Sequence, residues 1–189
     1  LSGLTSFTGS ASLGDMVLVS SATASSSASI EFTLGDYKEY KFFFVNIHPQ
    51  TSNADLMMNF STDNGSNYNV TKTSTHFRTL HDEADTATSL AYDSSNDMAQ
   101  GTGDLNILLN IGATDADMSG SGYLHLFNPS SSVYVKHFIA NLNRYDPAIY
   151  TVNQYTAGYA NTTSALTNIR FKMDSGNIDD GNILMFGLN

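Results

Sequence analysis

Hydrophobic and polar positions alternate along much of the chain at the spacing typical of β-strands. Ile30, Phe32 and Leu34 alternate with polar neighbours, and the stretch 169–173 repeats this pattern. Because successive side chains of a strand point to opposite faces, each stretch predicts one buried and one solvated face. Short apolar runs between turn-forming residues predict further strands at 15–21, 39–48, 73–81, 105–111, 122–128, 132–145 and 150–161, and two strands within 167–188.

Turn-forming residues separate these segments. Asn64-Gly65 lies between apolar positions of the stretch 55–70 and predicts a β-hairpin there. The sequence Asn-Pro-Ser-Ser-Ser before the stretch 132–145 predicts a second hairpin loop. Residues 82–104 are polar, acidic and contain glycine, so they are predicted to form one long surface loop.

About ten strands and no long helical pattern predict an all-β fold, an antiparallel, jelly-roll-like β-sandwich with long polar loops. Ser, Thr and Asn supply 24, 19 and 18 residues, which favours strands joined by turns over helices. We expect two parts, an N-terminal arm at 1–14 and a sandwich domain at 15–189.

Charge and cysteine content exclude several classes of protein. The formal net charge is −10, with 8 Lys and Arg against 18 Asp and Glu. Nucleic-acid binding needs basic side chains at the phosphates, so neither nucleic acid nor an anionic membrane surface is an expected partner. The chain has no cysteine, and no run approaches the ~20 apolar residues of a membrane helix, so membrane insertion is not expected.

The letters D-E-A-D at 82–85 coincide with the name of a helicase class. An ATPase site needs a glycine-rich loop ending in Gly-Lys-Ser/Thr, and the chain contains no Gly-Lys pair. There is also no G-x-S-x-G motif for a serine nucleophile, and no spacing identifies a catalytic carboxylate pair. We therefore assign no catalytic residue and expect no cofactor.

The strongest metal-binding pattern is the segment that contains Asp115, Asp117 and Ser119, followed by Gly120. Alternate oxygen-bearing side chains before a glycine match the first half of a calcium loop. The twelfth position, where a bidentate acid is expected, is Leu126. Two hypotheses stay open for this segment, a calcium site and an ordinary acidic loop.

The histidines form no recognisable zinc motif. His76 and His81 are five residues apart, so on a strand they point to opposite faces. His125 and His137 fall on neighbouring predicted strands and could meet across a sheet. We favour half-buried strand histidines with satisfied hydrogen bonds over metal ligands.

Several stretches taken together resemble a known family: "SSATASSSASIEFTLG", "EYKFFFVNIHP", "HFRTLHDEADT", "GYLHLFNPSSSVYVKHF" and "GYANTTSALTNIRFKMDSGNIDDGNILMFGL". They are similar to uncharacterised virion structural proteins of tailed bacteriophages, especially marine ones, over roughly residues 17–188. The resemblance implies a non-enzymatic β-sandwich on the outer surface of the virion, as head decoration, head fibre or tail component. It also implies a homo-oligomer, with a trimer expected, that binds other virion proteins.

Two functions from different classes remain open. The first is structural, and in it the apolar residues of the arm, Leu1, Leu4, Phe7 and Leu13, contact a second subunit or another virion protein. The second is recognition of a host-surface glycan, for which the ten tyrosines and the Asn- and Asp-containing loops would suit sugar stacking and hydroxyl bonding.

Overall fold

The computed structural model describes residues 16–189, which form 13 strands in two antiparallel sheets with no helix in this part of the chain. The predicted all-β sandwich is therefore confirmed, with more strands than the ten expected. The predicted arm and its contact residues lie outside the described residues: Leu1, Leu4, Phe7 and Leu13.

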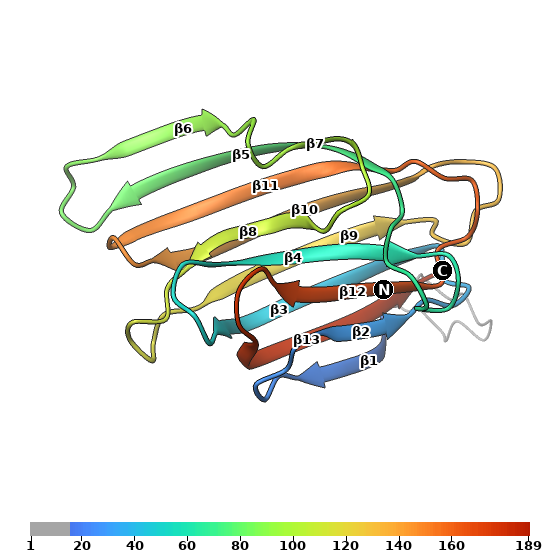
Figure 1. The fold of residues 1–189 in the computed structure, drawn as a ribbon, viewed down its shortest axis with the longest axis horizontal. Helices are drawn as coiled ribbons and strands as arrows, with labels where there is room; N and C mark the ends of the chain where they lie inside the picture. The colour runs from blue at the N-terminus through green and yellow to red at the C-terminus, as the bar shows by residue number, and fades with distance from the viewer. Residues whose placement is uncertain (1–15) are drawn as a thin grey trace, which may run out of the picture.

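The larger sheet contains nine strands and runs from β1 at one margin to β6 at the other (Figure 1). Its order is β1-β13-β3-β9-β10-β11-β5-β6, and β7 pairs with β5 beside this path. The bounds are β1 Val17–Thr23, β13 Ile178–Leu188, β3 Glu39–Pro49, β9 Gly120–Phe127, β10 Lys136–Asp146, β11 Tyr150–Ala160, β5 Lys72–Asp82, β6 Thr88–Tyr92 and β7 Met98–Gly101.

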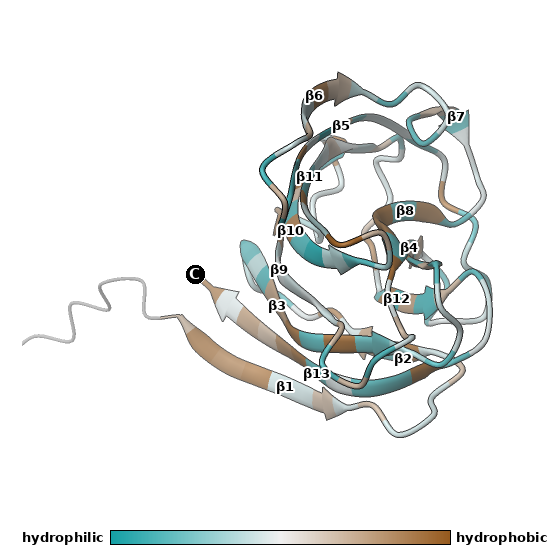
Figure 2. Cartoon of the chain, turned by 90° about the vertical axis from the view of Figure 1, so that its left-hand side faces the viewer, coloured by the Kyte–Doolittle hydropathy of each residue, from teal (hydrophilic) through white to brown (hydrophobic). Residues whose placement is uncertain are grey.

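The smaller sheet contains four strands in the order β2-β12-β4-β8. Their bounds are β2 Ile30–Thr33, β12 Asn168–Met173, β4 Ala54–Ser61 and β8 Leu105–Ile111. Figure 2 shows this sheet as a second layer beside the larger one. Strands from both ends of the chain lie side by side, because β2 pairs with β12 and β3 pairs with β13. This interleaving agrees with the jelly-roll-like arrangement that the sequence predicts.

Phe171 of β12 lies at the centre of the aromatic core between the two sheets. Its ring centroid is 5.4 Å from that of Phe42 and 5.1 Å from that of Phe44, both on β3, and 6.3 Å from that of Phe32 on β2. All three contacts are edge-to-face, the geometry that the aromatic quadrupole favours. The alternating apolar positions of the sequence thus supply this core from both layers.

The hairpin predicted at 55–70 is wrong, although the turn itself forms. Asn64 and Gly65 both have positive φ, of 59° and 82°. However, β4 pairs with β12 and β8 in the smaller sheet, whereas β5 begins only at Lys72 and pairs with β11 in the larger sheet. The turn therefore begins a crossover between the two layers, because each strand buries its apolar face against a different partner.

The loop predicted at 82–104 is also wrong in part, because β6 and β7 lie within it. β6 pairs with the last half of β5, from Phe77 to His81, and β7 pairs with its first residues. Both strands are largely exposed, so they have no buried face and no apolar alternation by which the sequence could reveal them. Cross-strand hydrogen bonds to β5 are what make them strands.

Candidate functional site

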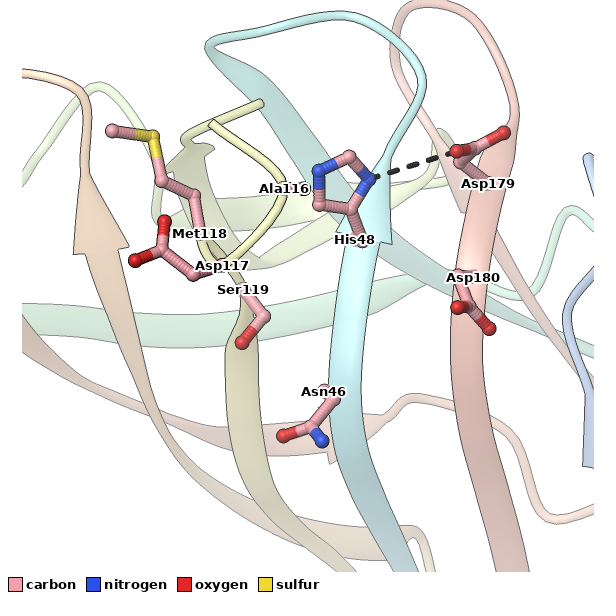
Figure 3. A pocket seen from close by; sticks show the side chains of 8 residues that line it. All are labelled: Asn46, His48, Ala116, Asp117, Met118, Ser119, Asp179 and Asp180. Carbon is pink, nitrogen blue, oxygen red and sulfur yellow. Dashed lines mark ion pairs between the residues drawn. The ribbon is translucent and has the colours of Figure 1, made fainter. Parts of the chain in front are cut away.

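A polar pocket of about 410 Å³ opens where β3, β13 and the turn before β9 meet (Figure 3). Asn46 and His48 come from β3, and Asp179 and Asp180 come from the first residues of β13. The turn before β9 contributes the remaining lining residues, Ala116, Asp117, Met118 and Ser119. Four of the eight lining residues are Asp or His, so the pocket suits a polar or cationic guest.

Irregularities in two adjacent strands shape this pocket. The pairing of β3 with β9 shifts register between Phe44 and Ile47, and Asn46 between them has a φ of 52°. The pairing of β13 with β3 shifts on either side of Asp180. Gly181 follows with a φ of 115°, and a Cβ at this position would lie 2.6 Å from the backbone oxygen of Asn46. The close approach of the two strands therefore requires glycine here.

His48 is the one imidazole in the pocket lining. Its Nδ1 lies 3.8 Å from Oδ2 of Asp179, and in Figure 3 its ring faces that carboxylate. Its Nε2 is buried and has no hydrogen-bond partner among the described residues. A buried polar atom without a partner is uncommon in a folded protein, so Nε2 of His48 is the unsatisfied polar atom of this site.

The structure separates the residues of the predicted calcium segment. Asp117 and Ser119 line the pocket, and in Figure 3 the Asp117 carboxylate points away from His48. Asp115 is not a lining residue; its backbone oxygen accepts a hydrogen bond from the N–H of Met118 and closes the turn. Within residues 16–189, no three His, Asp or Glu side chains come together as a set of metal ligands. The two hypotheses for this segment, a calcium site and an ordinary acidic loop, both stay open.

The D-E-A-D segment forms the turn of the hairpin between β5 and β6. Oδ1 of Asp82 accepts hydrogen bonds from the backbone N–H groups of Thr86 and Ala87, each at 2.8 Å. The Thr86 hydroxyl donates to Oδ2 of the same carboxylate. These hydrogen bonds, the hydroxyl's first, lower the pKa of Asp82. The Asp82 carboxylate thus closes this turn.

Four of the five histidines pair with an acid or lie in the core, and His137 is exposed on β10. His81 is exposed and lies 3.3 Å from Asp85, while His76, on the opposite face of β5, is fully buried. His125 on β9 contacts Glu39 through a 2.7 Å hydrogen bond. His125 is opposite Ile139, two residues from His137, so the two imidazoles share one sheet face. The preference for half-buried strand histidines with satisfied hydrogen bonds agrees with His125. His76 is hydrogen-bonded but fully buried, and His137 is exposed.

An aromatic row crosses the outer face of the larger sheet. Its members are direct cross-strand partners of one another, in the order Tyr92, Phe77, Tyr155, Asn141, Tyr123, Phe43 and Leu184. The rings of Phe77 and Tyr155 stack with centroids 4.8 Å apart. A neighbouring groove of about 520 Å³ is lined by Thr73, Ser74, Thr75, His137, Phe138, Ile139, Ala157, Gly158 and Tyr159. No local pattern in the sequence reveals this row, because its members are far apart along the chain.

The β1 strand exposes apolar side chains at the margin of the larger sheet. Met16, Val17, Leu18 and Val19 are all exposed, Leu18 by 51%. Among the described residues β1 pairs with β13 alone, and Figure 2 shows its hydrophobic first residues at the sheet margin. No charged residue occurs between Met16 and Ile30. Charged side chains, which commonly protect a sheet edge from pairing with other chains, are therefore missing from β1.

Comparison of the chain with family models, with curated protein sequences and with solved structures found no match. The resemblance to phage virion proteins therefore remains an expectation drawn from the sequence. No helix able to cross a membrane occurs among residues 16–189.

Proposed function

We propose that this chain is a non-enzymatic structural protein of a tailed-bacteriophage virion, placed on the outer surface as head decoration, head fibre or tail component. In this role it assembles with copies of itself and with other virion proteins. The observation that carries the proposal is the exposed apolar β1 strand at the sheet margin. An uncharged apolar edge favours aggregation unless another chain covers it, which is what assembly supplies.

We propose that the assembly is a trimer held together by β1. Leu18 lies opposite Phe186 and faces the outer side of the sheet, whereas Val17, opposite Gly187, points to the other side. Both faces of the first part of β1, residues 17–19, are thus apolar and exposed. In a threefold arrangement with β1 near the axis, each face contacts a different neighbouring subunit. Burial of each Val or Leu side chain contributes about 1.5–3 kcal/mol.

The test is the mass of the purified protein in solution, measured by light scattering. We expect three times the chain mass of 20.4 kDa for the wild type and a single chain for Leu18→Glu. The matched control is Leu90→Glu on β6 at the opposite margin, where the leucine is 73% exposed and the substitution should leave the trimer intact. A wild-type monomer, or a Leu18→Glu trimer, would contradict assembly through β1.

Placement on the particle needs a separate measurement. A reconstruction of the virion should show this sandwich as surface density, with β1 in contact with neighbouring chains. Density at an interior position, or a virion that lacks the chain, would contradict the proposal.

Glycan recognition is the second candidate function, and the aromatic row favours it. Exposed Tyr92 and Tyr123 present ring faces and hydroxyls, and the adjacent groove adds His137 and Tyr159. Aromatic faces pack on the apolar faces of sugars while polar tips bind hydroxyl groups. Binding of host-surface polysaccharide that is lost in Tyr159→Ala and kept in Leu18→Glu would support this function. Equal binding by both variants would argue against it.

A further inference from the structure

A buried lysine contacts a buried asparagine across the two sheets. Nζ of Lys72, at the start of β5, donates a 2.6 Å hydrogen bond to Oδ1 of Asn59 on β4, and a second one of 2.7 Å to the backbone oxygen of Val70. Both side chains are fully buried. The carbonyl carbon of Asn59 lies only one C=O bond, about 1.2 Å, beyond Oδ1. A small shift therefore brings a primary amine onto an amide carbon.

The neighbours of Asn59 fix the orientation of its amide. Nδ2 donates to the backbone oxygens of Tyr68 at 2.8 Å and Thr102 at 3.2 Å, and to Oδ1 of Asp104 at 3.1 Å. All three partners are acceptors, so nitrogen occupies this side of the amide and oxygen faces Lys72. The nitrogen that would leave in an attack on the amide carbon is therefore next to a carboxylate.

A backbone donor faces the amide oxygen. The N–H of Phe60 donates a 2.9 Å hydrogen bond to Oδ1 of Asn59. Attack on an amide carbon moves negative charge onto this oxygen, and a fixed N–H donor stabilises that charge. The donor belongs to β4 itself, so it needs no rearrangement during the reaction.

Burial also makes Lys72 a better nucleophile. Desolvation lowers the pKa of its amine to about 8, opposed by the charge of Asp104. An amine with that pKa is neutral in about a tenth of the molecules at neutral pH, whereas an exposed lysine near pKa 10.4 is almost entirely protonated. A nucleophilic lysine is activated by desolvation of this kind.

We propose that Lys72 and Asn59 form an intramolecular isopeptide bond. The lone pair of neutral Nζ attacks Cγ of Asn59, and the amide oxygen takes the negative charge beside the Phe60 N–H. Asp104 accepts a proton released by Nζ and delivers it to Nδ2. The Cγ–Nδ2 bond then breaks, ammonia leaves, and the Nζ–Cγ amide remains. No oxidant, metal or external reactant takes part.

The resulting bond joins β5 of the larger sheet covalently to β4 of the smaller sheet. It closes the crossover that begins with the Asn64-Gly65 turn, so the two layers could not separate at this point without breaking a covalent bond. The inference is independent of the proposed function, because it concerns the chemistry of the folded chain alone.

Lys136 provides an internal comparison. It is fully buried on β10, opposite Ala160, which is in turn opposite Lys72. Among the described residues its Nζ donates only to the backbone oxygen of Thr162. Without a side-chain amide at its Nζ, Lys136 should not react.

The direct test is the intact mass of the full-length chain under denaturing conditions. We expect the wild type, after incubation in its folded state, to be lighter than its sequence mass by one ammonia molecule. Protease digestion should yield a branched peptide that joins positions 59 and 72. A wild-type mass equal to the sequence mass after prolonged incubation above the pKa of Lys72 would overturn the proposal, whatever the variants do.

Variants separate the roles of the residues. Lys72→Met should retain the full sequence mass, whereas Lys136→Met should lose ammonia as the wild type does. Asp104→Asn should form the bond at least tenfold more slowly, because general acid–base catalysis commonly contributes that much or more. Mass loss in Lys72→Met, or a wild-type rate in Asp104→Asn, would contradict the assigned lysine or the assigned proton carrier respectively.

Discussion

Gln154 donates a 2.9 Å hydrogen bond from its Nε2 to Nε2 of His76 on the buried face of the larger sheet. The side-chain oxygen of Gln154 accepts hydrogen bonds from Nη1 of Arg144 at 2.8 Å and from the backbone N–H of Leu109 at 2.7 Å. These two donors fix the orientation of the amide, so its NH₂ group faces His76. Nε2 of His76 is therefore an acceptor. The ring proton lies on Nδ1 and is donated to the Thr156 hydroxyl at 3.0 Å.

This arrangement predicts that stability depends on the neutral form of His76. Burial lowers its pKa below the ordinary 6.5; Asp93 opposes this shift, while Arg78 and Arg144 add to it. The unfolded chain therefore takes up a proton at a higher pH than the folded chain does. The contribution of neutral His76 is fully present above about 6.5 and is lost as the pH falls below it, at about 1.4 kcal/mol per unit of pKa difference.

The measurement is the free energy of unfolding in urea at a series of pH values. We expect it to fall as the pH decreases below 6.5 in the wild type, and to change less over this window in His76→Gln. The comparison isolates His76 from carboxylates that titrate at lower pH. Equal pH dependence in both proteins would contradict the assignment.

Arg144 supports the same buried cluster. Its guanidinium donates to Gln154, to the backbone oxygen of Asn110 at 3.1 Å and to Asp146 at 2.9 Å. Arg144→Met should lower the free energy of unfolding by about 3 kcal/mol, because three acceptors lose their donor. Lys38→Met removes an exposed charge and is the control. It should change the free energy of unfolding by less than about 0.5 kcal/mol. Similar losses in both variants would argue against the role of the buried cluster.

Gly181→Ala tests the bulge that shapes the polar pocket. Because Gly181 has a positive φ and lies close to the backbone oxygen of Asn46, the substitution should lower the free energy of unfolding by about 1–3 kcal/mol. Gly103→Ala is the matched control, because a Cβ at Gly103 meets nothing within 4 Å. Thermal unfolding of the two variants compares them directly. An unchanged melting temperature in Gly181→Ala would show that β3 and β13 can separate without cost.

Phe171→Ala tests the aromatic core. Removing this ring from between Phe42 and Phe44 should lower the free energy of unfolding by about 3–5 kcal/mol, measured in urea. Phe186→Ala removes a half-buried ring from the outer face and should lower the free energy of unfolding by clearly less. A larger loss of stability in Phe186→Ala than in Phe171→Ala would contradict the position of the main core between the two sheets.

The sequence alone determined which segments are strands wherever one face of the strand is buried. The alternation at Ile30 and Phe32, and again at Ile169 and Phe171, is a local signal, because adjacent side chains of a strand point to opposite faces. The turn at Asn64-Gly65 is equally local, since it follows from the backbone freedom of these two residues. The all-β fold class needs only such local signals.

The tertiary structure alone decided which strands pair and which polar groups meet. β6 and β7 carry no buried face, so only their hydrogen bonds to β5 define them. The His48 pocket depends on register shifts in β3 and β13, and the Lys72–Asn59 contact joins two sheets across a crossover. Pairing and contact across a fold depend on which distant surfaces bury one another, and no local pattern of hydrophobic and polar residues specifies that choice.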